Sequence, residues 1–307
     1  MDNLENEFKR SCYVDSLGRE FYYIHIDRGN KRLGIHFSAF FGDWGDAPKH
    51  RQTFGGYFHR LRMLGTDEST DWLFLCDAYG ADENGTYYIG KQNDPFVENA
   101  IKEILALVGL GIRYPMNNTV TIGSSMGATA ALKFGLIYMV NGIIAVSPHI
   151  DLDISAEMQN RERHVSWILD DGDTQNSVNF PTTRRIRLLL DGLISDKAPL
   201  PSLFVQSCRD DKGVHFEQVV PLVKQWEAGG GTVWFDDRTF GGHTSEFATR
   251  ALLLDVVRRF LQNDPLMIKT YKWSPIFRPY GFMNAIQIRI RLQLGRFRRY
   301  VMPSSSD

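Results

Sequence analysis

Ser125 is the residue whose type and surroundings point most directly to chemistry. It is the central residue of the sequence GSSMG at positions 123–127, which follows an apolar, β-branched run and precedes an alanine-rich stretch. This is the pattern G-x-S-x-G between a strand and a helix, in which the serine projects from a very sharp turn. The flanking glycines fit because larger side chains would collide with the backbone there. We therefore predict a nucleophilic serine rather than a Gly/Ser-rich turn without a chemical role.

A serine hydroxyl is a weak nucleophile at neutral pH and needs an adjacent base, usually a histidine held by a carboxylate. Of the eight histidines, His243 lies in the sequence GGHTSE, after the last expected strand and just before the last expected helix. The glycines allow this loop to bring the imidazole over the serine, so we predict that His243 is the base. His149 directly follows another strand and is expected to line the site without acting as the base.

The carboxylate of such a site is expected in the sequence LFVQSCRDDKGVH, where a strand ends in a polar turn. Asp210 and Asp211 are both candidates: one would accept the imidazole proton, and the other would cap the next helix or face solvent. We favour Asp210, the third residue after the expected strand end at Ser207. The catalytic order along the chain is then Ser, Asp, His.

Two backbone N–H groups are expected to stabilise the negative oxygen that develops when such a serine attacks a carbonyl. Met126, directly after the serine, supplies one of them. We assign the second to Phe40, in the loop after the strand-like sequence LGIHFSA. No histidines and cysteines have the spacing of a zinc site, so no metal is expected.

The rest of the chain alternates strands with helices, which is typical of an α/β fold with a mostly parallel sheet and helices on both faces. We expect strands near 21–26, 33–39, 72–76, 119–123, 142–146, 202–206 and 232–235, and helices near 54–64, 95–108, 126–140, 216–227 and 245–261. The first two strands are expected to form an antiparallel hairpin through a turn at 27–30. Residues 151–201 interrupt the alternation and would fold over the carboxyl edge of the sheet as a cap.

Charge divides the chain into two parts. From Leu266 onward there are eight basic residues and one acidic residue, so this segment carries +7; because the whole chain carries −1, the preceding part carries −8. We therefore expect an α/β domain over 1–265 and a basic C-terminal extension over 266–307. Residues 286–294 alternate apolar and polar side chains, as a strand with one apolar face does. We expect this strand to pack on the domain; a membrane surface or a polyanion is the alternative partner.

Composition excludes several other classes of protein. A hydrophobic fraction of 43% supports a packed core rather than disorder. The first residues, MDNLENEFKR, do not resemble a signal peptide, and no apolar run approaches the roughly 18 residues of a membrane span. The three cysteines form no disulfide framework, which favours a reducing compartment. We therefore expect a cytoplasmic protein.

Three motifs resemble those of a known family. They are CDAYGADENGTYYIG over 76–90, IGSSMGATAALKFG around Ser125, and the pair SCRDDKGVH and GGHTSE. Together they are similar to the α/β-hydrolase superfamily over residues 21–261. Within that superfamily, they resemble a bacterial branch of glycan O-acetyltransferases that includes capsular-polysaccharide O-acetyltransferases, and the acetyltransferase-like component of accessory secretion systems. The basic extension is not part of this resemblance.

The resemblance implies catalytic roles for Ser125, Asp210 and His243, acetyl-CoA as co-substrate, and no permanently bound cofactor. We predict an O-acetyltransferase that passes acetyl through the serine to hydroxyls of a bacterial capsular or other surface polysaccharide, with no nucleic-acid partner. An esterase would use the same residues with water as the acceptor. A non-catalytic glycan- or partner-binding scaffold is the third interpretation, which an intact catalytic set disfavours.

Two further groups of residues are candidate glycan contacts. Tyr87 and Tyr88 would either stack on a sugar ring or fill the core. Arginines of the expected cap form a basic group, for which a solvated face is the first interpretation and contact with the phosphates of coenzyme A or with an anionic glycan is the second. They are Arg161, Arg163, Arg184, Arg185 and Arg187.

Overall fold

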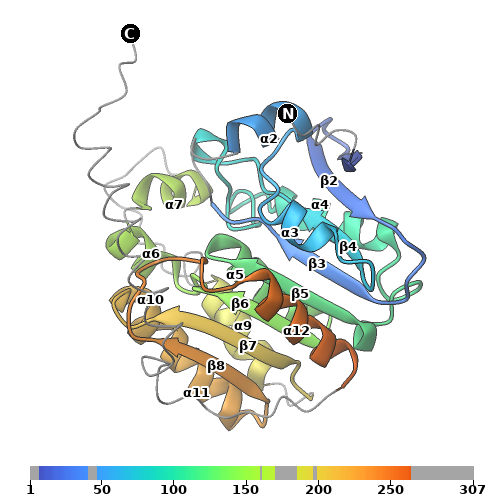
Figure 1. The fold of residues 1–307 in the computed structure, drawn as a ribbon. Helices are drawn as coiled ribbons and strands as arrows, with labels where there is room; N and C mark the ends of the chain where they lie inside the picture. Colours follow the sequence, from blue (N-terminus) through green and yellow to red (C-terminus); the bar gives the residue numbers. More distant parts are fainter. Residues whose placement is uncertain (1–6, 41–46, 160, 170–184, 196–198, 264–307) are drawn as a thin grey trace, which may run out of the picture.

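The computed structural model describes residues 7–40, 47–159, 161–169, 185–195 and 199–263, which form an α/β fold (Figure 1). Eight strands form one sheet in the order β1-β2-β4-β3-β5-β6-β7-β8, and the pairs from β4 to β8 are parallel. The strands are β1 (Arg10–Val14), β2 (Glu20–Ile26), β3 (Leu33–Phe37), β4 (Asp71–Leu75), β5 (Thr119–Ser124), β6 (Gly142–Val146), β7 (Ser202–Cys208) and β8 (Val233–Arg238). The predicted fold class is confirmed.

Helices cover both faces of this sheet, as predicted. One apolar layer combines side chains of α4, α5, α9 and α11 with one face of the strands, and the other combines α3 and α12 with the opposite face. The helices are α2 (Ala47–Phe54), α3 (Leu61–Gly65), α4 (Phe96–Val108), α5 (Met126–Ile137), α6 (Leu152–Gln159), α7 (Glu162–Leu169), α9 (Arg185–Ser195), α10 (Lys212–Val214), α11 (Val220–Ala228) and α12 (Arg250–Leu261). The central strands are therefore buried on both sides.

The predicted hairpin between the first two expected strands is wrong. β4 lies between β2 and β3, pairing antiparallel with β2 and parallel with β3. Residues 27–32 therefore do reverse the direction of the chain, but they leave a space of one strand between β2 and β3, and Asp71 at the start of β4 holds this connection. Its carboxylate accepts hydrogen bonds from the backbone N–H of Arg28 at 2.9 Å and from the side chain of Asn30 at 3.0 Å. The antiparallel hairpin is instead formed by β1 and β2.

The described parts of the segment that was expected to form a cap, residues 151–201, occupy two different places in the fold. α6 and α7 follow the carboxyl end of β6, whereas α9 packs into the core, where Leu190 and Ile194 are buried. α9 therefore belongs to the layer that contains α5. The predicted basic extension and its alternating strand at 286–294 lie outside the described residues.

A buried ion pair joins α4 and α5. Lys133 Nζ lies 2.9 Å from Glu98 Oε2 and also donates to the carbonyl of Tyr88 at 2.9 Å. Burial acts to raise the pKa of Glu98, but the charge of Lys133 and the hydrogen bonds from Lys102 and Lys133 outweigh it and hold the pKa at about 2. The pair thus stabilises the folded chain and anchors the loop that contains Tyr88.

Glu98→Gln is expected to lower the free energy of unfolding at pH 7 by about 3–5 kcal/mol, because Lys133 would stay buried without its carboxylate. The pKa of Glu98 falls from an ordinary 4.5 to about 2 on folding, so the contribution is complete above pH 4.5 and is lost as the pH falls towards 2. Urea unfolding at several pH values measures both effects. Lys102→Met, at a more exposed partner, is the control, with an expected loss below about 1 kcal/mol. Parallel wild-type and Glu98→Gln curves across this pH range would contradict the assignment.

Candidate active site

Ser125 lies at the turn between β5 and α5, with a backbone φ of 53°. The two flanking glycines are required by close backbone contacts. A Cβ at Gly123 would lie 2.0 Å from the carbonyl oxygen of Gly127, and a Cβ at Gly127 would lie 2.2 Å from the carbonyl oxygen of Phe37. Both distances are far below van der Waals contact. The sharp turn therefore lifts the half-buried serine above the carboxyl edge of the sheet.

A chain of hydrogen bonds connects Ser125 to His243 and Asp211. Ser125 Oγ lies 2.8 Å from His243 Nε2, and His243 Nδ1 lies 2.7 Å from Asp211 Oδ2. A carboxylate only accepts hydrogen bonds, so Nδ1 of the neutral ring carries the proton and Nε2 presents a lone pair to the serine hydroxyl. The aspartate side chain is 4% exposed and the histidine 23%, so the histidine is partly open to solvent whereas the carboxylate is almost fully buried. This geometry suits proton removal from the serine.

The carboxylate beside His243 is Asp211, and the prediction of Asp210 for this position is wrong. β7 extends one residue beyond the expected end, to Cys208, so the turn begins later. Asp210 is exposed and accepts hydrogen bonds from the backbone N–H groups of Gly241 and Gly242, at 3.1 and 2.8 Å. The two neighbouring aspartates thus act on the same loop in different ways: one contacts the imidazole and the other holds the backbone.

The backbone around the two expected oxyanion-hole residues is consistent with their assignment, which stays a prediction. Met126 is the first residue of α5, and the first N–H groups of a helix have no acceptor within it. Phe40 lies in the segment after β3, and the carbonyls of Phe37, the last residue of β3, and of Ser38 approach Gly127 closely. The two N–H groups therefore belong to backbone segments that lie against each other beside Ser125.

The motif over 76–90 folds around a buried aspartate. Asp77 accepts hydrogen bonds from the backbone N–H groups of Thr86 and Tyr88 and from the Thr86 hydroxyl. Burial raises the pKa of this carboxyl, and the hydrogen bonds oppose the shift. Within the loop, Gly85 lies so close to the Met126 side chain that a Cβ there would be 2.4 Å from its sulfur. The motif therefore supports the residue that follows the nucleophile.

Tyr87 and Tyr88 are core residues, with 2% and 0% of their surface exposed. Tyr88 contacts the carbonyls of Ser38 and Leu75 through its hydroxyl, each at 3.1 Å. Tyr87 lies beneath the site, with its ring centroid 6.0 Å from that of His149. Of the two interpretations, core filling is confirmed for both residues.

Two residues near the site have closer contacts than the sequence suggested. His149 Nε2 lies 3.2 Å from His243 Nε2. The guanidinium of Arg161 lies over the ring of Phe40, 3.9 Å from its centroid, and burial lowers the pKa of this arginine. Among the described residues no carboxylate pairs with Arg161, whereas Arg163 pairs with Asp82 at 3.0 Å. The position of His149 just after a parallel strand was the one available signal for its placement.

A π-helical turn, His215–Val219, ties the loop of Asp211 to the loop of His149. Gln218 in this turn accepts hydrogen bonds from the backbone N–H groups of Ile150 and Asp151, at 2.6 and 2.9 Å. Such turns are frequent at functional sites. Here the turn fixes the backbone that follows His149.

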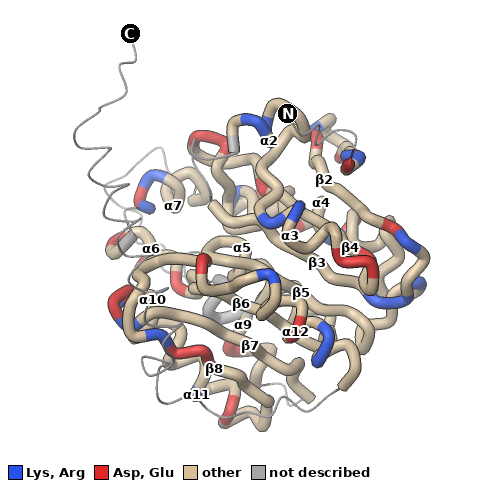
Figure 2. Tube along the Cα trace, viewed as in Figure 1, with Lys and Arg blue, Asp and Glu red and all other residues tan. Residues whose placement is uncertain are grey.

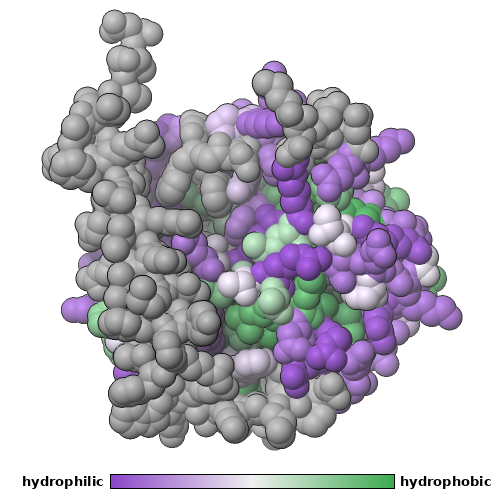
Figure 3. Space-filling model, in the orientation of Figure 1, coloured by the Kyte–Doolittle hydropathy of each residue, from purple (hydrophilic) through white to green (hydrophobic). Residues whose placement is uncertain are grey.

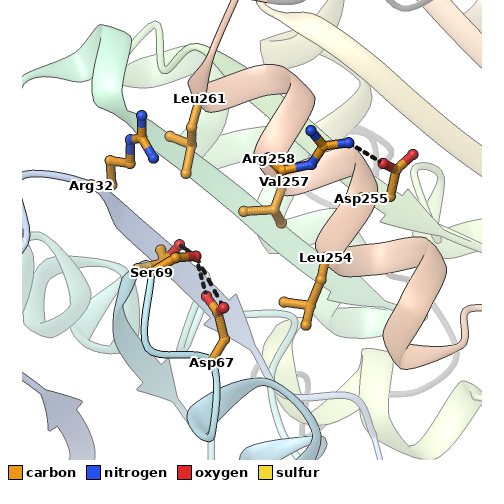
Figure 4. Close-up of a pocket in the computed structure, with 9 residues that line it drawn as sticks. Arg32, Asp67, Ser69, Leu254, Asp255, Val257, Arg258 and Leu261 are labelled. Carbon is orange, nitrogen blue, oxygen red and sulfur yellow. Dashed lines mark hydrogen bonds and ion pairs between the residues drawn. The ribbon is translucent and has the colours of Figure 1, made fainter.

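A separate cavity of about 290 Å³ lies at the amino-terminal ends of the parallel strands, on the side of the sheet away from Ser125. It is formed by helix α12 and by the segments that precede β3 and β4 (Figure 4). Leu254, Val257 and Leu261 form its apolar wall, and Figure 3 shows an apolar area with hydrophilic surroundings on this face. Arg258 at its rim already pairs with Asp255. Because the strands are parallel, this cavity is remote from Ser125 at their carboxyl ends.

The described residues contain no group of three or more histidine, cysteine or acidic side chains that could hold a metal ion. None of the helices in the described ranges is long and apolar enough to cross a membrane. Acidic and basic residues are interspersed along the trace in Figure 2.

No protein-family model matches the sequence, and no curated protein sequence matches it. Several solved structures, however, are similar to this one in fold. The capsule O-acetyltransferase of Neisseria meningitidis serogroup A has a TM-score of 0.60 at 21% identity, over 80% of this chain and 96% of its own. A mutant of that enzyme in complex with CoA has a TM-score of 0.59 at 21% identity, over 83% of this chain and 100% of its own.

Two further solved structures are similar. The Glycosylation Associate Protein (Gap123) complex of Streptococcus agalactiae has a TM-score of 0.59 at 19% identity, over 83% of this chain and 47% of that chain. The fluorophosphonate-binding serine hydrolase FphF of Staphylococcus aureus has a TM-score of 0.58 at 13% identity, over 83% and 98%. At such identities the likeness concerns the fold. The chain has an α/β-hydrolase fold, and its likeness in fold to capsule O-acetyltransferases is confirmed.

Proposed function

We propose that this protein is a serine O-acetyltransferase that moves acetyl from acetyl-CoA to hydroxyls of a bacterial capsular or other surface polysaccharide. The observation that carries the proposal is the hydrogen-bonded chain from Ser125 through His243 to Asp211. This chain supplies the nucleophile, the base and the group that orients the base, which are the three roles of acyl transfer.

The first half-reaction forms an acetyl-enzyme. His243 Nε2 takes the proton of Ser125 Oγ as this oxygen attacks the thioester carbonyl of acetyl-CoA. The N–H groups of Met126 and Phe40 stabilise the negative oxygen of the tetrahedral intermediate. The C–S bond then breaks, the thiolate of CoA takes the proton from His243, and acetyl remains on the serine as an ester.

The second half-reaction transfers the acetyl group. A sugar hydroxyl gives its proton to His243 Nε2 while its oxygen attacks the acetyl carbon, and Ser125 Oγ leaves with that proton. Throughout, Asp211 holds the ring in the tautomer that presents Nε2 to the substrate and stabilises the imidazolium that forms. Both half-reactions use one base, so the proposed reaction needs only one histidine as its proton carrier.

The choice of acetyl-CoA as donor rests on similarity in fold. The structural match includes 96% of the capsule O-acetyltransferase of N. meningitidis serogroup A, and a mutant of that enzyme is in complex with CoA. Acetyl-CoA is a cytoplasmic metabolite, so we assign the reaction to the cytoplasm. The basic residues after Leu266 would add attraction for an anionic polymer or membrane surface.

The test is to mix the protein with acetyl-CoA and no acceptor, and to follow free thiol and intact mass. The proposal expects one acetyl group per chain, located on Ser125 by peptide mapping, and its transfer when a capsular polysaccharide is added. Absence of this adduct together with fast hydrolysis of simple acetate esters would establish the esterase instead. Absence of both reactions would favour a binding scaffold.

Arg161→Gln is expected to weaken binding of an anionic substrate, because the guanidinium beside the site has no carboxylate partner among the described residues. A charge-assisted hydrogen bond contributes about 1.5–3 kcal/mol, which corresponds to a KM for acetyl-CoA raised about 10- to 100-fold with little change in kcat. Steady-state kinetics measures this, and Arg163→Gln is the matched control, because that guanidinium pairs with Asp82. Equal effects of the two variants would refute a specific contact.

A further inference from the structure

His149 is a second histidine in direct contact with the expected base. It follows β6 and is 1% exposed. Its ring centroid lies 4.7 Å from that of His243, and the two Nε2 atoms are 3.2 Å apart. His243 Nε2 therefore has two neighbours, Ser125 Oγ and His149 Nε2. The mechanism above uses only the first of them.

The hydrogen bonds of Ser155 determine which nitrogen of His149 carries the proton. Ser155 Oγ lies 2.8 Å from the carbonyl oxygen of Asp151 and 2.6 Å from His149 Nδ1. A hydroxyl has one proton, and the carbonyl only accepts, so Ser155 donates to Asp151 and accepts from His149. Nδ1 of His149 is thus protonated.

The other nitrogen of His149 then presents a lone pair to the base. Burial, followed by repulsion from His243 when it is protonated and from Arg161, lowers the pKa of His149 well below its usual value, so the ring is neutral. With its proton on Nδ1, its Nε2 is an acceptor. While His243 is neutral, the two facing Nε2 atoms share no proton.

We propose that His149 is a positioning residue that accepts a hydrogen bond from His243 Nε2–H once the base has taken a proton. This inference rests on the proposed role of His243 as the base. The contact stabilises the imidazolium in both half-reactions. It also gives the N–H an acceptor other than Ser125 Oγ, so the proton is held beside the reacting atoms until the CoA thiolate takes it in the first half-reaction or Ser125 Oγ takes it in the second.

The surroundings hold His149 in this position. Its backbone N–H donates to Thr129 Oγ1 at 3.1 Å, and the next two N–H groups donate to Gln218. The charged and titratable groups that face the two histidine rings are Asp211 after β7, Tyr87 from the loop after β4, and Arg161 just before α7, whereas Asp210 is bonded to the backbone of the His243 loop. Asp211 is already bonded to Nδ1 of His243, which leaves His149 as the side-chain acceptor for Nε2–H besides Ser125 Oγ.

The test uses two measurements that need neither acetyl-CoA nor a glycan. Nitrogen-15 NMR of the histidine rings reads the tautomer of His149 directly. The rate at which a fluorophosphonate labels Ser125, measured against pH, reads how readily the base loses its proton. We expect a protonated Nδ1 on His149. In His149→Phe we expect labelling to be about tenfold slower. We also expect the midpoint of the curve of labelling rate against pH to lie about one pH unit lower, because the protonated base has lost its acceptor.

His149→Gln, whose amide oxygen is an acceptor, is expected to restore most of the wild-type midpoint. Ser155→Ala, which removes the acceptor for Nδ1–H, is expected to move the midpoint in the same direction as phenylalanine and serves if His149→Phe does not fold. An unchanged midpoint with slower labelling would reduce His149 to a packing role. A higher midpoint, or a proton on its Nε2, would mean that it donates to the base and would overturn the inference.

The inference and the proposed function fail in different ways. If the protein shows the expected labelling profile but transfers no acetyl, the inference about His149 stands and only the proposed substrates are wrong. Wild-type protein whose serine is not labelled would overturn the role of His243 as base, and the inference with it. A Ser125→Ala sample supplies the labelling background.

Discussion

Ser125→Ala is expected to abolish acyl transfer, with kcat reduced by about 10⁶-fold, while the fold stays intact. The substitution removes the hydroxyl that donates to His243 and nothing from the core, because the backbone of the turn is set by Gly123 and Gly127. Alanine and serine are equally strained at a φ of 53°, so the melting temperature should change little. Thiol release from acetyl-CoA, acetyl-enzyme mass and thermal unfolding together measure this result.

Ser124→Ala provides a matched control one residue away. The hydroxyl of Ser124 is buried and has no hydrogen-bond partner among the described residues, so its removal should leave turnover within about threefold of wild type. Substantial turnover by Ser125→Ala, or an acetyl group found on another residue of that variant, would show that the nucleophile lies elsewhere.

Asp211→Asn is expected to lower kcat by about 10⁴-fold, because the amide no longer holds the imidazole in the tautomer with its proton on Nδ1. The distance of 2.7 Å between Asp211 Oδ2 and His243 Nδ1, and the burial of the carboxylate, make this contact the support of the base. Asp210→Asn removes a charge of the same size next to it. It keeps one carbonyl oxygen for the backbone N–H groups of Gly241 and Gly242, and we expect a loss of about tenfold or less.

Comparison of kcat and KM for the two asparagine variants, with circular dichroism to check the fold, distinguishes these roles. Equal losses in both would mean that the loop of His243, rather than its tautomer, limits activity. A larger loss in Asp210→Asn would restore the original assignment of that residue.

The sequence predicted the turn at Ser125 well because its determinants are local. A strand, two glycines around a serine, and a helix follow one another within a short stretch, and each element is visible in the order of residue types. The spacing of His243, between the last strand and the last helix, was likewise sufficient to identify the histidine that contacts Ser125.

The assignment of the aspartate failed because it depended on where β7 ends. Ending the strand at Ser207 rather than Cys208 was enough to favour Asp210, and sequence patterns do not locate strand ends to one residue.

The incorrect prediction of a hairpin between the first two expected strands had a different cause. A short turn favours pairing of neighbouring strands, and only tertiary contacts, such as Asp71 with residues 28–30, insert β4 between them.

The contacts of His149 and Arg161 could not be predicted because they join distant segments. The residue pairs His149–His243 and Arg161–Phe40 are brought together only by the order of the strands and by the path of the chain after β6. Residue type alone indicated a histidine near the edge of the sheet and an arginine in an insertion.

The order of the strands gives the site an uneven resistance to local opening. Ser125 follows β5, in the middle of the sheet, whereas His243 follows β8, which forms an edge of the sheet in the described part of the chain. Edge segments open at a lower free energy than buried central strands. The base would therefore leave the site more often than the nucleophile does. An acetyl group loaded on Ser125 would survive most such excursions, because without the base its transfer and its hydrolysis are both much slower.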